Sequence, residues 1–356
     1  MAPHHETIAI AMSGGVDSSV AAALLLEQGF NVFGVMLRLW SAGPDTSNRC
    51  CSPEDVSLAR RVAIQLDIPF HTLDVRDTFK REVVDPFIDD YAKGRTPNPC
   101  MRCNRIIRWG SLLESALAMG ASRLATGHYA RISHLGDRYH LFRAKDKTKD
   151  QSYVLSVLQQ HQLSRTIFPL GDIEKTKVRE QAAMLNLPIA DRAESQDLCF
   201  VGEQDYRDFL TDQGIHLSSP GSILDDKGAI LGQHTGLANY TIGQRKGIGV
   251  TKAYPLYVIN KNIRDNVLVV GPKDSLGRMS FHIGQTNWIS GSPPSGNGSI
   301  LVRVRYKAEE VGATIRLINN DLAEVQLQDS LNDVTPGQHA VFYDGEECLG
   351  GGIILL

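Results

Sequence analysis

The chain has 356 residues, more than a single domain usually holds, so we expect two or three packed units. Hydrophobic residues make up 42% and charged residues 22%, which is typical of a globular protein and excludes collagen-like, disordered and small disulfide-scaffold chains. The formal net charge of −3 excludes a uniformly basic coat for nucleic acid. The first residues lack the regions of a secretory signal, and no apolar run approaches the roughly 20 residues that cross a bilayer. We therefore expect a cytoplasmic protein with no membrane partner.

Lysine and arginine are grouped along the chain. The stretches 91–113 and 234–264 each hold five of them and no acid, and 115–149 holds seven against two acids. Solvated faces would explain any one such stretch. Three of them in a net acidic chain favour a surface shaped for a polyanion, and so raise nucleic acid as a partner.

Short apolar strands alternate with helices in the first part of the chain. The expected strands are 7–12, 32–39, 70–75 and 124–126. The expected helices are 20–26, ended by Gly29, a helix from Pro53 capped by Ser52, a helix that carries Phe79, Val83, Phe87 and Tyr91, and 105–119, ended by Gly120. This alternation predicts an α/β fold with a doubly wound parallel sheet.

The pattern changes after Cys199, where glycine becomes frequent and turns such as 226–228 appear. From about residue 299 apolar side chains recur at every second position, and further strands are expected at 313–317, 323–327, 340–343 and 352–356. These features predict a small antiparallel barrel or sandwich, with 290–299 as a loop. We divide the chain into a catalytic domain (1–205), a small central linking domain (206–280) and a C-terminal β-barrel that contacts the polyanion (281–356).

The segment 13–19 reads SGGVDSS and lies between the first strand and the first helix. Glycines let the backbone approach a phosphate, the amides of a helix start attract negative charge, and Asp17 can cap the helix or help to hold a metal. Neither the Walker A pattern nor G-x-G-x-x-G is present. The segment resembles the loop of the PP-loop ATP pyrophosphatases, which cleave ATP to AMP and pyrophosphate in order to adenylate a substrate.

Six cysteines in so long a chain form no disulfide framework, so we interpret them as metal ligands or catalytic thiols. In 96–104 (TPNPCMRCN) two prolines stiffen a loop, and Asn104 is placed to cap the following helix. This would put Cys103 at a helix N-terminus beside two arginines, an environment that favours a nucleophilic thiolate. Cys199 lies in AESQDLCFV (193–201), which by itself fits a buried core thiol equally well.

Four further motifs accompany the loop and the cysteines. They are GHYAR (127–131), KDQSY (149–153), YTIGQRKG (240–247) and RVRYK (303–307). In this order and over essentially the whole chain, the motifs resemble those of the tRNA-uridine 2-sulfurtransferases, also called tRNA-specific 2-thiouridylases.

The resemblance implies several groups of site residues. ATP would be bound by Ala11, Met12, Ser13, Gly14, Gly15, Val16, Asp17, Ser18, Leu37 and Gly127. The target base would adjoin Asn98, Pro99 and Cys100, and tRNA would be contacted by His128, Lys149, Asp150, Gln151, Arg305, Tyr306 and Gln338. Cys103 would be the catalytic nucleophile and Cys199 the persulfide carrier. Taken singly, His128 also fits a satisfied structural histidine and Arg305 an exposed charge on a strand.

The implied reaction is ATP-dependent 2-thiolation of the wobble uridine in tRNA. The uracil O2 would be adenylated, sulfur would come from a Cys199 persulfide, and the products would be 2-thiouridine, AMP and pyrophosphate. The implied cofactors are ATP and Mg²⁺. The implied partners are the anticodon arm of tRNA and a persulfide donor such as a cysteine desulfurase or a sulfur-relay protein.

One position departs from the family pattern, because many members have Asp where this chain has Cys100. Cys100, Cys103 and Cys199 together could ligate a four-iron four-sulfur cluster with one open iron, as in related RNA thiolases. Two other function classes also stay open: an ATP-dependent ligase or amidotransferase on the same fold, and an RNA-binding protein with a relic nucleotide loop. Cys50, Cys51 and Cys348 match no motif.

Overall fold

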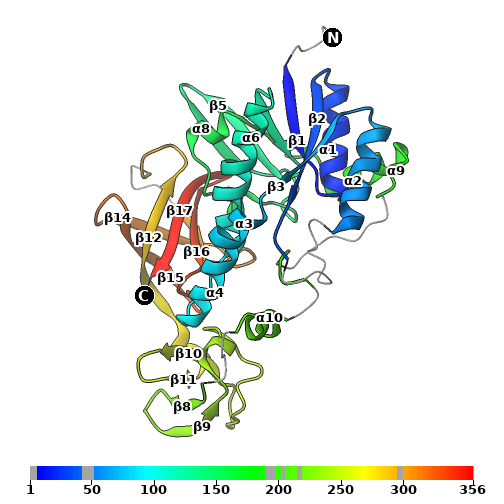
Figure 1. Ribbon diagram of the computed structural model, residues 1–356. Helices are drawn as coiled ribbons and strands as arrows, with labels where there is room; N and C mark the ends of the chain where they lie inside the picture. The colour runs from blue at the N-terminus through cyan, green and yellow to red at the C-terminus, as the bar shows by residue number, and fades with distance from the viewer. Residues whose placement is uncertain are drawn as a thin grey trace.

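The structure, a computed structural model, describes residues 6–41, 52–189, 198–202, 205–214, 219–294 and 300–355. Cys50, Cys51, the segment 190–197 that leads into Cys199, and part of the loop expected at 290–299 lie outside these residues. The chain forms an N-terminal parallel sheet with helices, a small central sheet and a C-terminal antiparallel barrel (Figure 1). This confirms the predicted fold class. Within the described ranges, no helix is both long and apolar enough to cross a membrane.

The N-terminal sheet has five parallel strands in the order β3-β2-β1-β4-β7. They are β1 (Thr7–Ala11), β2 (Asn31–Arg38), β3 (Phe70–Asp74), β4 (Arg123–Thr126) and β7 (Thr166–Ile167). The chain proceeds from β1 to β2 on one side, whereas β4 pairs with β1 on the other, so the strand order reverses between β1 and β4. Open α/β sheets bind ligands at the carboxyl ends of the strands beside such a reversal.

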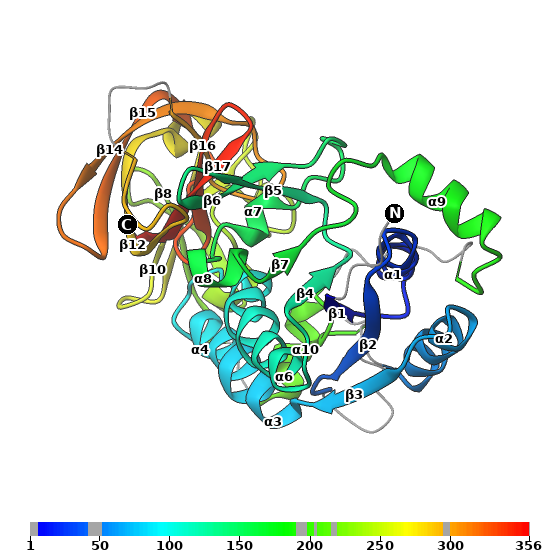
Figure 2. The same cartoon turned by 90° about the horizontal axis from the view of Figure 1, so that it is seen from above.

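Helices cover both faces of this sheet (Figure 2). α1 (Val16–Glu27), α2 (Pro53–Gln65) and α9 (Lys175–Met184) share an apolar cluster with Ile8 and Ile10 of β1. Ala9 points to the opposite face and belongs to the cluster of the helix that contains Trp109. β1 is therefore buried on both faces, as its continuous apolar run predicts.

Two helical segments follow β3, and each contains a π-helical stretch. The first comprises α3 (Arg76–Phe79), η1 (Lys80–Val84) and α4 (Asp85–Ala92); the second comprises α5 (Pro99–Arg102), η2 (Cys103–Leu112) and α6 (Leu113–Ala118). The helix expected from Arg105 thus begins at Pro99, and its N-cap is Asn98, whose side chain accepts from the amide of Met101 at 3.4 Å. The prediction that Asn104 is the cap was wrong. Proline suits the first helical position because the amide it lacks would have no partner there.

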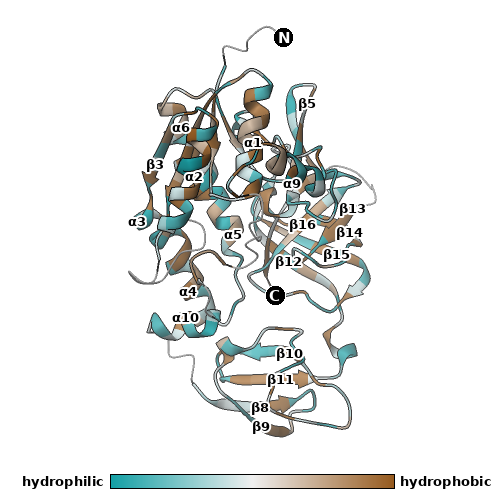
Figure 3. Cartoon of the chain, turned by 90° about the vertical axis from the view of Figure 1, so that its right-hand side faces the viewer, coloured by the Kyte–Doolittle hydropathy of each residue, from teal (hydrophilic) through white to brown (hydrophobic). Residues whose placement is uncertain are grey.

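The central sheet lies apart from the other two and below them in Figure 3. It has the order β10-β11-β8-β9, with β8 (Gly221–Asp225), β9 (Ile230–His234), β10 (Tyr257–Asn262) and β11 (Val267–Gly271). The turn expected at 226–228 joins β8 to β9. The short helices η3 (Leu237–Asn239) and η4 (Lys273–Leu276) accompany the sheet, whereas α10 (Tyr206–Asp212) packs into the apolar cluster of the N-terminal helices that contains Phe79 and Phe87.

The C-terminal barrel closes through the pairing of β12 with β17. Its strands are β12 (Arg278–Trp288), β13 (Ile300–Arg303), β14 (Val311–Leu317), β15 (Leu322–Leu331), β16 (His339–Asp344) and β17 (Glu347–Leu355). The hairpin of β5 (Ala130–Leu135) and β6 (Arg138–Arg143) comes from the N-terminal part of the chain and joins β17, where Cys348 pairs with Leu141. The helices α7 (Ser152–Leu155) and α8 (Gln160–Leu163) follow this hairpin. The barrel sheet therefore contains strands from both ends of the sequence.

Candidate active site

The glycine-serine loop lies at the carboxyl end of β1, beside the reversal of strand order. Helix α1 begins at Val16, inside the motif and earlier than the predicted Val20. Gly14 has a φ of +70°, a left-handed conformation that favours glycine. The Ser18 hydroxyl accepts from the Ser13 amide at 3.2 Å and donates to the Gly15 carbonyl at 3.2 Å. These bonds hold the backbone as a cradle at a helix N-terminus, which is suited to a phosphate.

Gly127 follows β4 and touches the start of α1. A Cβ atom at Gly127 would lie 2.7 Å from the Ser18 amide nitrogen and 2.8 Å from the Asp17 carbonyl carbon. Only a residue without a side chain allows this approach. The structure thus brings Gly127 against the loop, as the resemblance implies, although a nucleotide-binding role for these residues stays a prediction.

Asp17 receives two donors from distant parts of the chain. Tyr129 donates its hydroxyl to Asp17 Oδ1 at 2.7 Å, and buried Lys175 places Nζ 2.5 Å from the same oxygen. Asp17 makes no capping hydrogen bond to α1. Lys175 is the first residue of α9, and no motif in the sequence pointed to it. In a Walker A motif the lysine is part of the loop itself. Here the fold brings a lysine to the loop from a distant part of the chain.

The two cysteines of the 96–104 motif occupy different environments. Cys100 is exposed in the first turn of α5, whereas Cys103 is buried in η2, one turn further on. The expected placement of Cys103 at the helix N-terminus was wrong because the helix starts four residues before it. Cys100, and not Cys103, lies in the first turn of this helix.

Cys103 belongs to one apolar cluster, and the half-buried Cys199 packs against the same cluster. Phe200 packs against two other aromatic residues of this cluster. The centre of its ring lies 5.9 Å from that of Phe79 and 5.2 Å from that of Phe87. Leu37, at the carboxyl end of β2, packs against the same cluster. The two cysteines therefore lie near the sheet edge that carries the phosphate loop.

Cys100, Cys103 and Cys199 do not form a metal-ligand group. In the part of the chain that the structure describes, which includes all three, no set of three or more His, Cys, Asp or Glu side chains could hold a metal ion. These three thiols therefore do not converge on a single metal ion in this structure. Cys348, in β17, is buried with its thiol against the Ser152 carbonyl, and burial raises the pKa of this thiol to about 12.

The loop before α5 is attached to the barrel. Gln338 donates Nε2 to the carbonyl of Thr96 at 2.9 Å, and the Thr96 amide donates to the carbonyl of Pro336 at 3.1 Å. Tyr153, the last residue of the KDQSY motif, donates its hydroxyl to the carbonyl of His339 at 2.9 Å. Figure 3 shows α5 between the N-terminal helices and the barrel. Gln338 therefore holds the cysteine loop against the barrel, and its contact with tRNA stays a prediction.

The predicted tRNA residues of KDQSY and RVRYK also come together. Tyr306 donates its hydroxyl to the backbone carbonyl of Asp150 at 3.1 Å. Arg305 donates Nη2 to the Ile242 carbonyl at 3.0 Å and also bonds Thr335, and burial lowers the pKa of its guanidinium. This guanidinium is engaged by the protein and ties the barrel to the YTIGQRKG motif.

Asp150 and Gln151 use their side chains within the protein. The Asp150 carboxylate accepts from the amides of Ala144 and Ser152 at 3.0 and 3.1 Å. The Gln151 side-chain oxygen accepts from the Tyr129 amide at 3.0 Å, and neighbouring Lys149 is half-buried. These contacts join the KDQSY motif to the residue that bonds Asp17.

Both ring nitrogens of His128 have protein partners. Arg108, a permanent donor, lies 3.1 Å from Nε2, so Nε2 accepts and the Nδ1 proton points to the Thr126 hydroxyl at 2.7 Å. Burial and the charge of Arg108 lower the pKa of His128 well below its ordinary value. The geometry fits the satisfied structural histidine that the sequence left as an alternative. Because Arg108 belongs to η2 and His128 directly follows Gly127, this pair also links the helix that contains Cys103 to Gly127.

Many of the grouped bases are neutralised by acids from other segments. In 91–113, Lys93 pairs with Asp89 at 2.5 Å and Arg95 with Asp90 at 2.5 Å, while Arg102 lies 3.7 Å from Glu82. Arg105 makes no hydrogen bond or ion pair with any residue in the described ranges. In the folded protein these stretches therefore carry less net positive charge on their surfaces than their sequences alone suggest.

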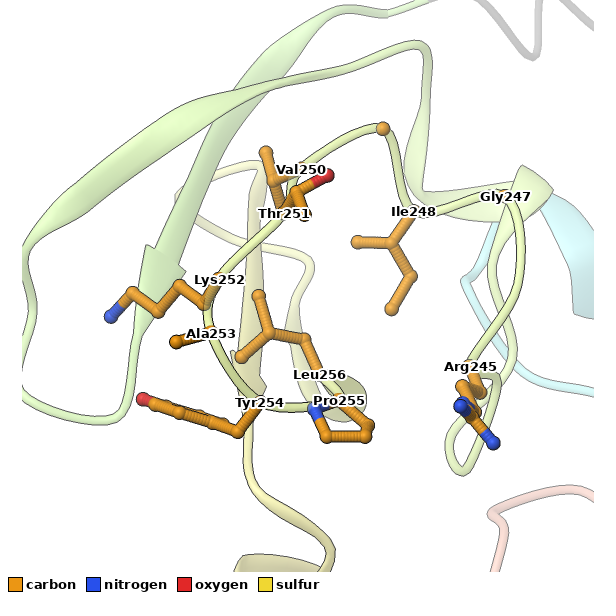
Figure 4. Close-up of a pocket in the computed structure, with 11 residues that line it drawn as sticks. Arg245, Gly247, Ile248, Val250, Thr251, Lys252, Ala253, Tyr254, Pro255 and Leu256 are labelled. Carbon is orange, nitrogen blue, oxygen red and sulfur yellow. The ribbon is translucent and has the colours of Figure 1, made fainter.

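Two of the hollows on the described surface can be compared with the predicted site residues. One, of 280 Å³, lies between the cysteine loop and the barrel and includes Asn98 and Pro99 in its walls. The other, of 640 Å³, is enclosed by the single loop 245–256 of the central domain. Figure 4 shows Lys252 and Tyr254 of that loop pointing to the same side, with Arg245 apart from them. None of the predicted site residues lines the larger hollow.

Three family models match the chain, one for each part. Residues 6–203 match the tRNA methyl transferase HUP domain, 207–272 the tRNA methyl transferase PRC-barrel domain, and 278–354 the aminomethyltransferase beta-barrel domain.

Similar curated proteins cover nearly the whole chain. The tRNA-specific 2-thiouridylase MnmA of Moorella thermoacetica is 46% identical over 97% of this chain and 98% of its own length. The protein of that name from Heliobacterium modesticaldum is 44% identical over 98% and 92%, and that of Chloroflexus aurantiacus is 45% identical over 98% and 98%.

Proposed function

Because this chain belongs to the tRNA-specific 2-thiouridylase family, we propose that it uses ATP to replace the O2 oxygen of a tRNA wobble uridine with sulfur. The observation that carries this proposal is the placement of Cys103 and Cys199 at one apolar cluster beside the edge that holds the phosphate loop. The descriptions of two matched models name methyl transfer. A phosphate loop and two cysteines are the groups that activation and sulfur transfer need, and we favour thiolation.

In the proposed first step, the uracil O2 attacks the α-phosphorus of ATP and pyrophosphate leaves. The loop 13–18 would hold the phosphates through its amides and hydroxyls, with Lys175 as an added cation. Asp17 fits a Mg²⁺ ion that takes its other ligands from phosphates and water, since Mg²⁺ commonly binds one or two carboxylates. When bound, the ion would neutralise phosphate charge.

In the proposed second step, a donor protein has left a persulfide on Cys199. The Cys103 thiolate attacks the inner sulfur, hydrosulfide is released, and a Cys103–Cys199 disulfide forms. The hydrosulfide then attacks C2 and displaces AMP. Alternatively, the terminal persulfide sulfur attacks C2 first and Cys103 then frees the thiolated base. Either order leaves the same disulfide, which an external thiol must reduce before the next turnover.

The remaining assignments are proposals of the same kind. Asn98, Pro99 and Cys100 would adjoin the target base. The two-cysteine route predicts that the disulfide forms during turnover, which needs both thiols close together. The division at 205/206 and 280/281, the cytoplasmic location and a desulfurase or sulfur-relay partner also belong to this proposal.

The test is nucleoside mass spectrometry of tRNA incubated with the purified chain, ATP and a persulfide source. We expect 2-thiouridine with the wild type and none without ATP. Cys103→Ser and Cys199→Ser should each lower product at least about 100-fold, whereas Cys348→Ser, at a buried thiol outside the site, should retain it. Thiolation by Cys199→Ser would contradict the persulfide route.

Anaerobic purification with iron analysis tests the alternative that uses an iron-sulfur cluster. Less than one iron per ten chains in fully active enzyme would exclude it. Close to four irons per chain, lost in Cys100→Ser together with activity, would replace the persulfide route by the cluster.

A further inference from the structure

The 280 Å³ cavity lies beside the cysteine loop, between that loop and the barrel. Its walls include Asn98, Pro99, Arg102 and Arg105, yet none of Cys100, Cys103 and Cys199 lines it. The reacting base must reach the sulfurs, which do not line this cavity, so we assign the cavity to a neighbouring group of the same substrate. The cavity nevertheless shares a helix with the cysteines, so its occupant lies close to the reacting base.

The polar walls of the cavity are positively charged, and some of their polar atoms have no hydrogen-bond partner in the described part of the chain. Arg105 has no hydrogen-bond or ion-pair partner in the described part of the chain, whereas the only acid in the walls, Asp90, already pairs with Arg95 at 2.5 Å. The buried Nδ1 of His339 also has no hydrogen-bond partner there. A buried polar atom without a partner costs free energy, so such atoms point to a ligand or a water that is bound in the working state.

The barrel adds a second, independent sign of a built site. Gln285, in the cavity wall, has a φ of +51°, a left-handed conformation that is rare outside glycine. It sits where the pairing of β12 with β17 shifts register. Bulges of this kind redirect a side chain, and backbone strain concentrates at functional sites. Asn287, two residues later, is tied to the carbonyls of Ser156 and Leu158 at 2.8 and 3.0 Å, which holds the wall in place.

We propose that this cavity binds a second nucleotide of the RNA strand, adjacent to the uridine that reacts, with Arg105 on its phosphate and His339 on its base. The proposal rests on the proposed function, because it assumes an RNA substrate. Phe87, Pro86 and Ile353 supply apolar walls for a base. Proteins read single-stranded loops by such splayed bases, which they stack on apolar surfaces and bond at their edges.

Size and charge agree with one nucleotide. Pockets for drug-sized ligands measure about 300–1,000 Å³, so 280 Å³ has room for a single base and its phosphate at the mouth. Burial and the nearby charge of Arg105 lower the pKa of His339 to about 4, so its ring is neutral at pH 7 and bonds a base edge through one donor and one acceptor nitrogen.

The test combines base removal with substitution of the cavity. RNA hairpins that carry the target uridine are made with an abasic site at each position flanking it, and Kd is measured by fluorescence anisotropy without ATP. We expect one abasic position to weaken wild-type binding about 10-fold. In Arg105→Gln and in His339→Asn, intact RNA should bind about 10-fold more weakly, and the same abasic site should then cost less than about twofold. Arg61→Gln, which removes an exposed charge from α2, should keep the full abasic penalty.

Equal abasic penalties in wild type and both cavity variants would overturn the proposal, as would the absence of any penalty in the wild type. A thermal melt checks that each variant is folded. If only one of the two variants folds, that variant is sufficient for the test. The binding assay does not depend on catalysis. If the separate mass-spectrometric test detected no thiolation, the dependence of the abasic penalty on Arg105 and His339 would still stand. If tRNA is thiolated but the abasic penalty is the same in the wild type and in both cavity variants, the proposed nucleotide site in the cavity is rejected and the proposed function stands.

Discussion

At the scale of single residues, Asp17 and Lys175 form the ion pair that the phosphate loop is built around. Lys175 has only 9% of its side-chain surface exposed, and it reaches Asp17 from the first turn of α9. Removing one partner of a buried pair leaves the other charge without compensation. In the proposed nucleotide site, the uncompensated charge would be a carboxylate beside the phosphates of ATP.

We therefore expect Lys175→Ala to weaken ATP binding at least about 10-fold, by loss of a cation and by repulsion from Asp17. Lys175→Arg should recover part of the affinity. Isothermal titration with ATP and Mg²⁺ measures this effect. Lys177→Ala, an exposed lysine of the same helix, is the matched control and should bind as the wild type. Unchanged affinity in Lys175→Ala would remove this residue from the nucleotide site.

His339 makes the stability of the fold depend on pH. Its pKa is lowered to about 4 in the folded state, below the ordinary value of 6.5, so the unfolded chain binds more protons as the pH falls below 6.5. Stability should therefore fall with falling pH through this window, by up to about 2 kcal/mol between pH 6.5 and 5. Urea unfolding at both pH values tests this. His339→Asn should show a correspondingly smaller loss, and an identical loss would assign the effect to other groups such as His128.

At the scale of elements, the contact of β4 with α1 depends on Gly127. A methyl group there would overlap the backbone at Ser18, and backbone cannot rotate away as a side chain can. Overpacking of this kind costs about 1–3 kcal/mol. The shift would also move the amides that form the cradle.

Gly127→Ala should thus lower the free energy of unfolding by about 1–3 kcal/mol and weaken ATP binding in addition. Chemical denaturation and ATP titration measure the two effects. Gly110→Ala is the control, because its nearest neighbour would be 3.7 Å away, an ordinary contact. Normal ATP affinity in Gly127→Ala would show that the loop tolerates displacement.

The start of the cysteine helix shows how an element can mislead sequence reasoning. Asn98 and Pro99 are both good start signals, but two prolines in four residues also indicate a loop. The π-helical stretch 103–112 then shifts the helical period, so the apolar spacing supports a later start. The helix boundary decides which thiol lies at the positive helix end.

At the scale of the whole molecule, pairing between segments decides where positive charge remains for RNA. Lys252 pairs with Asp225 at 2.9 Å, and Lys261 donates to the Tyr240 carbonyl at 2.9 Å while burial lowers its pKa to about 8. Arg245 and Lys246 stay exposed on the central domain and have no ion pair among the described residues. Together with Arg264, which is also exposed, they are the bases of 234–264 that remain available to phosphates.

The double variant Arg245→Gln/Lys246→Gln should reduce the slope of log Kd against log salt concentration for tRNA by about 1 to 2. Each phosphate contact releases counterions, so the loss of two contacts flattens the dependence. Binding titrations at several salt concentrations give the slope. Lys227→Gln, an exposed lysine at another turn of the central domain, should leave it unchanged. An unchanged slope in the double variant would place the tRNA elsewhere.

The amino-acid sequence alone determined the parallel sheet, the phosphate loop, the capped α2 and the C-terminal barrel, because apolar period, glycine placement and capping residues act over a few neighbouring positions. Tertiary structure decided the contacts on which the site depends. It brought Lys175 to Asp17, placed Cys103 and Cys199 at one cluster, and engaged His128 and Arg305 within the protein. These results come from packing between segments far apart in the chain, and no local pattern records which side chains will meet when the sheet, the helices and the barrel close on one another.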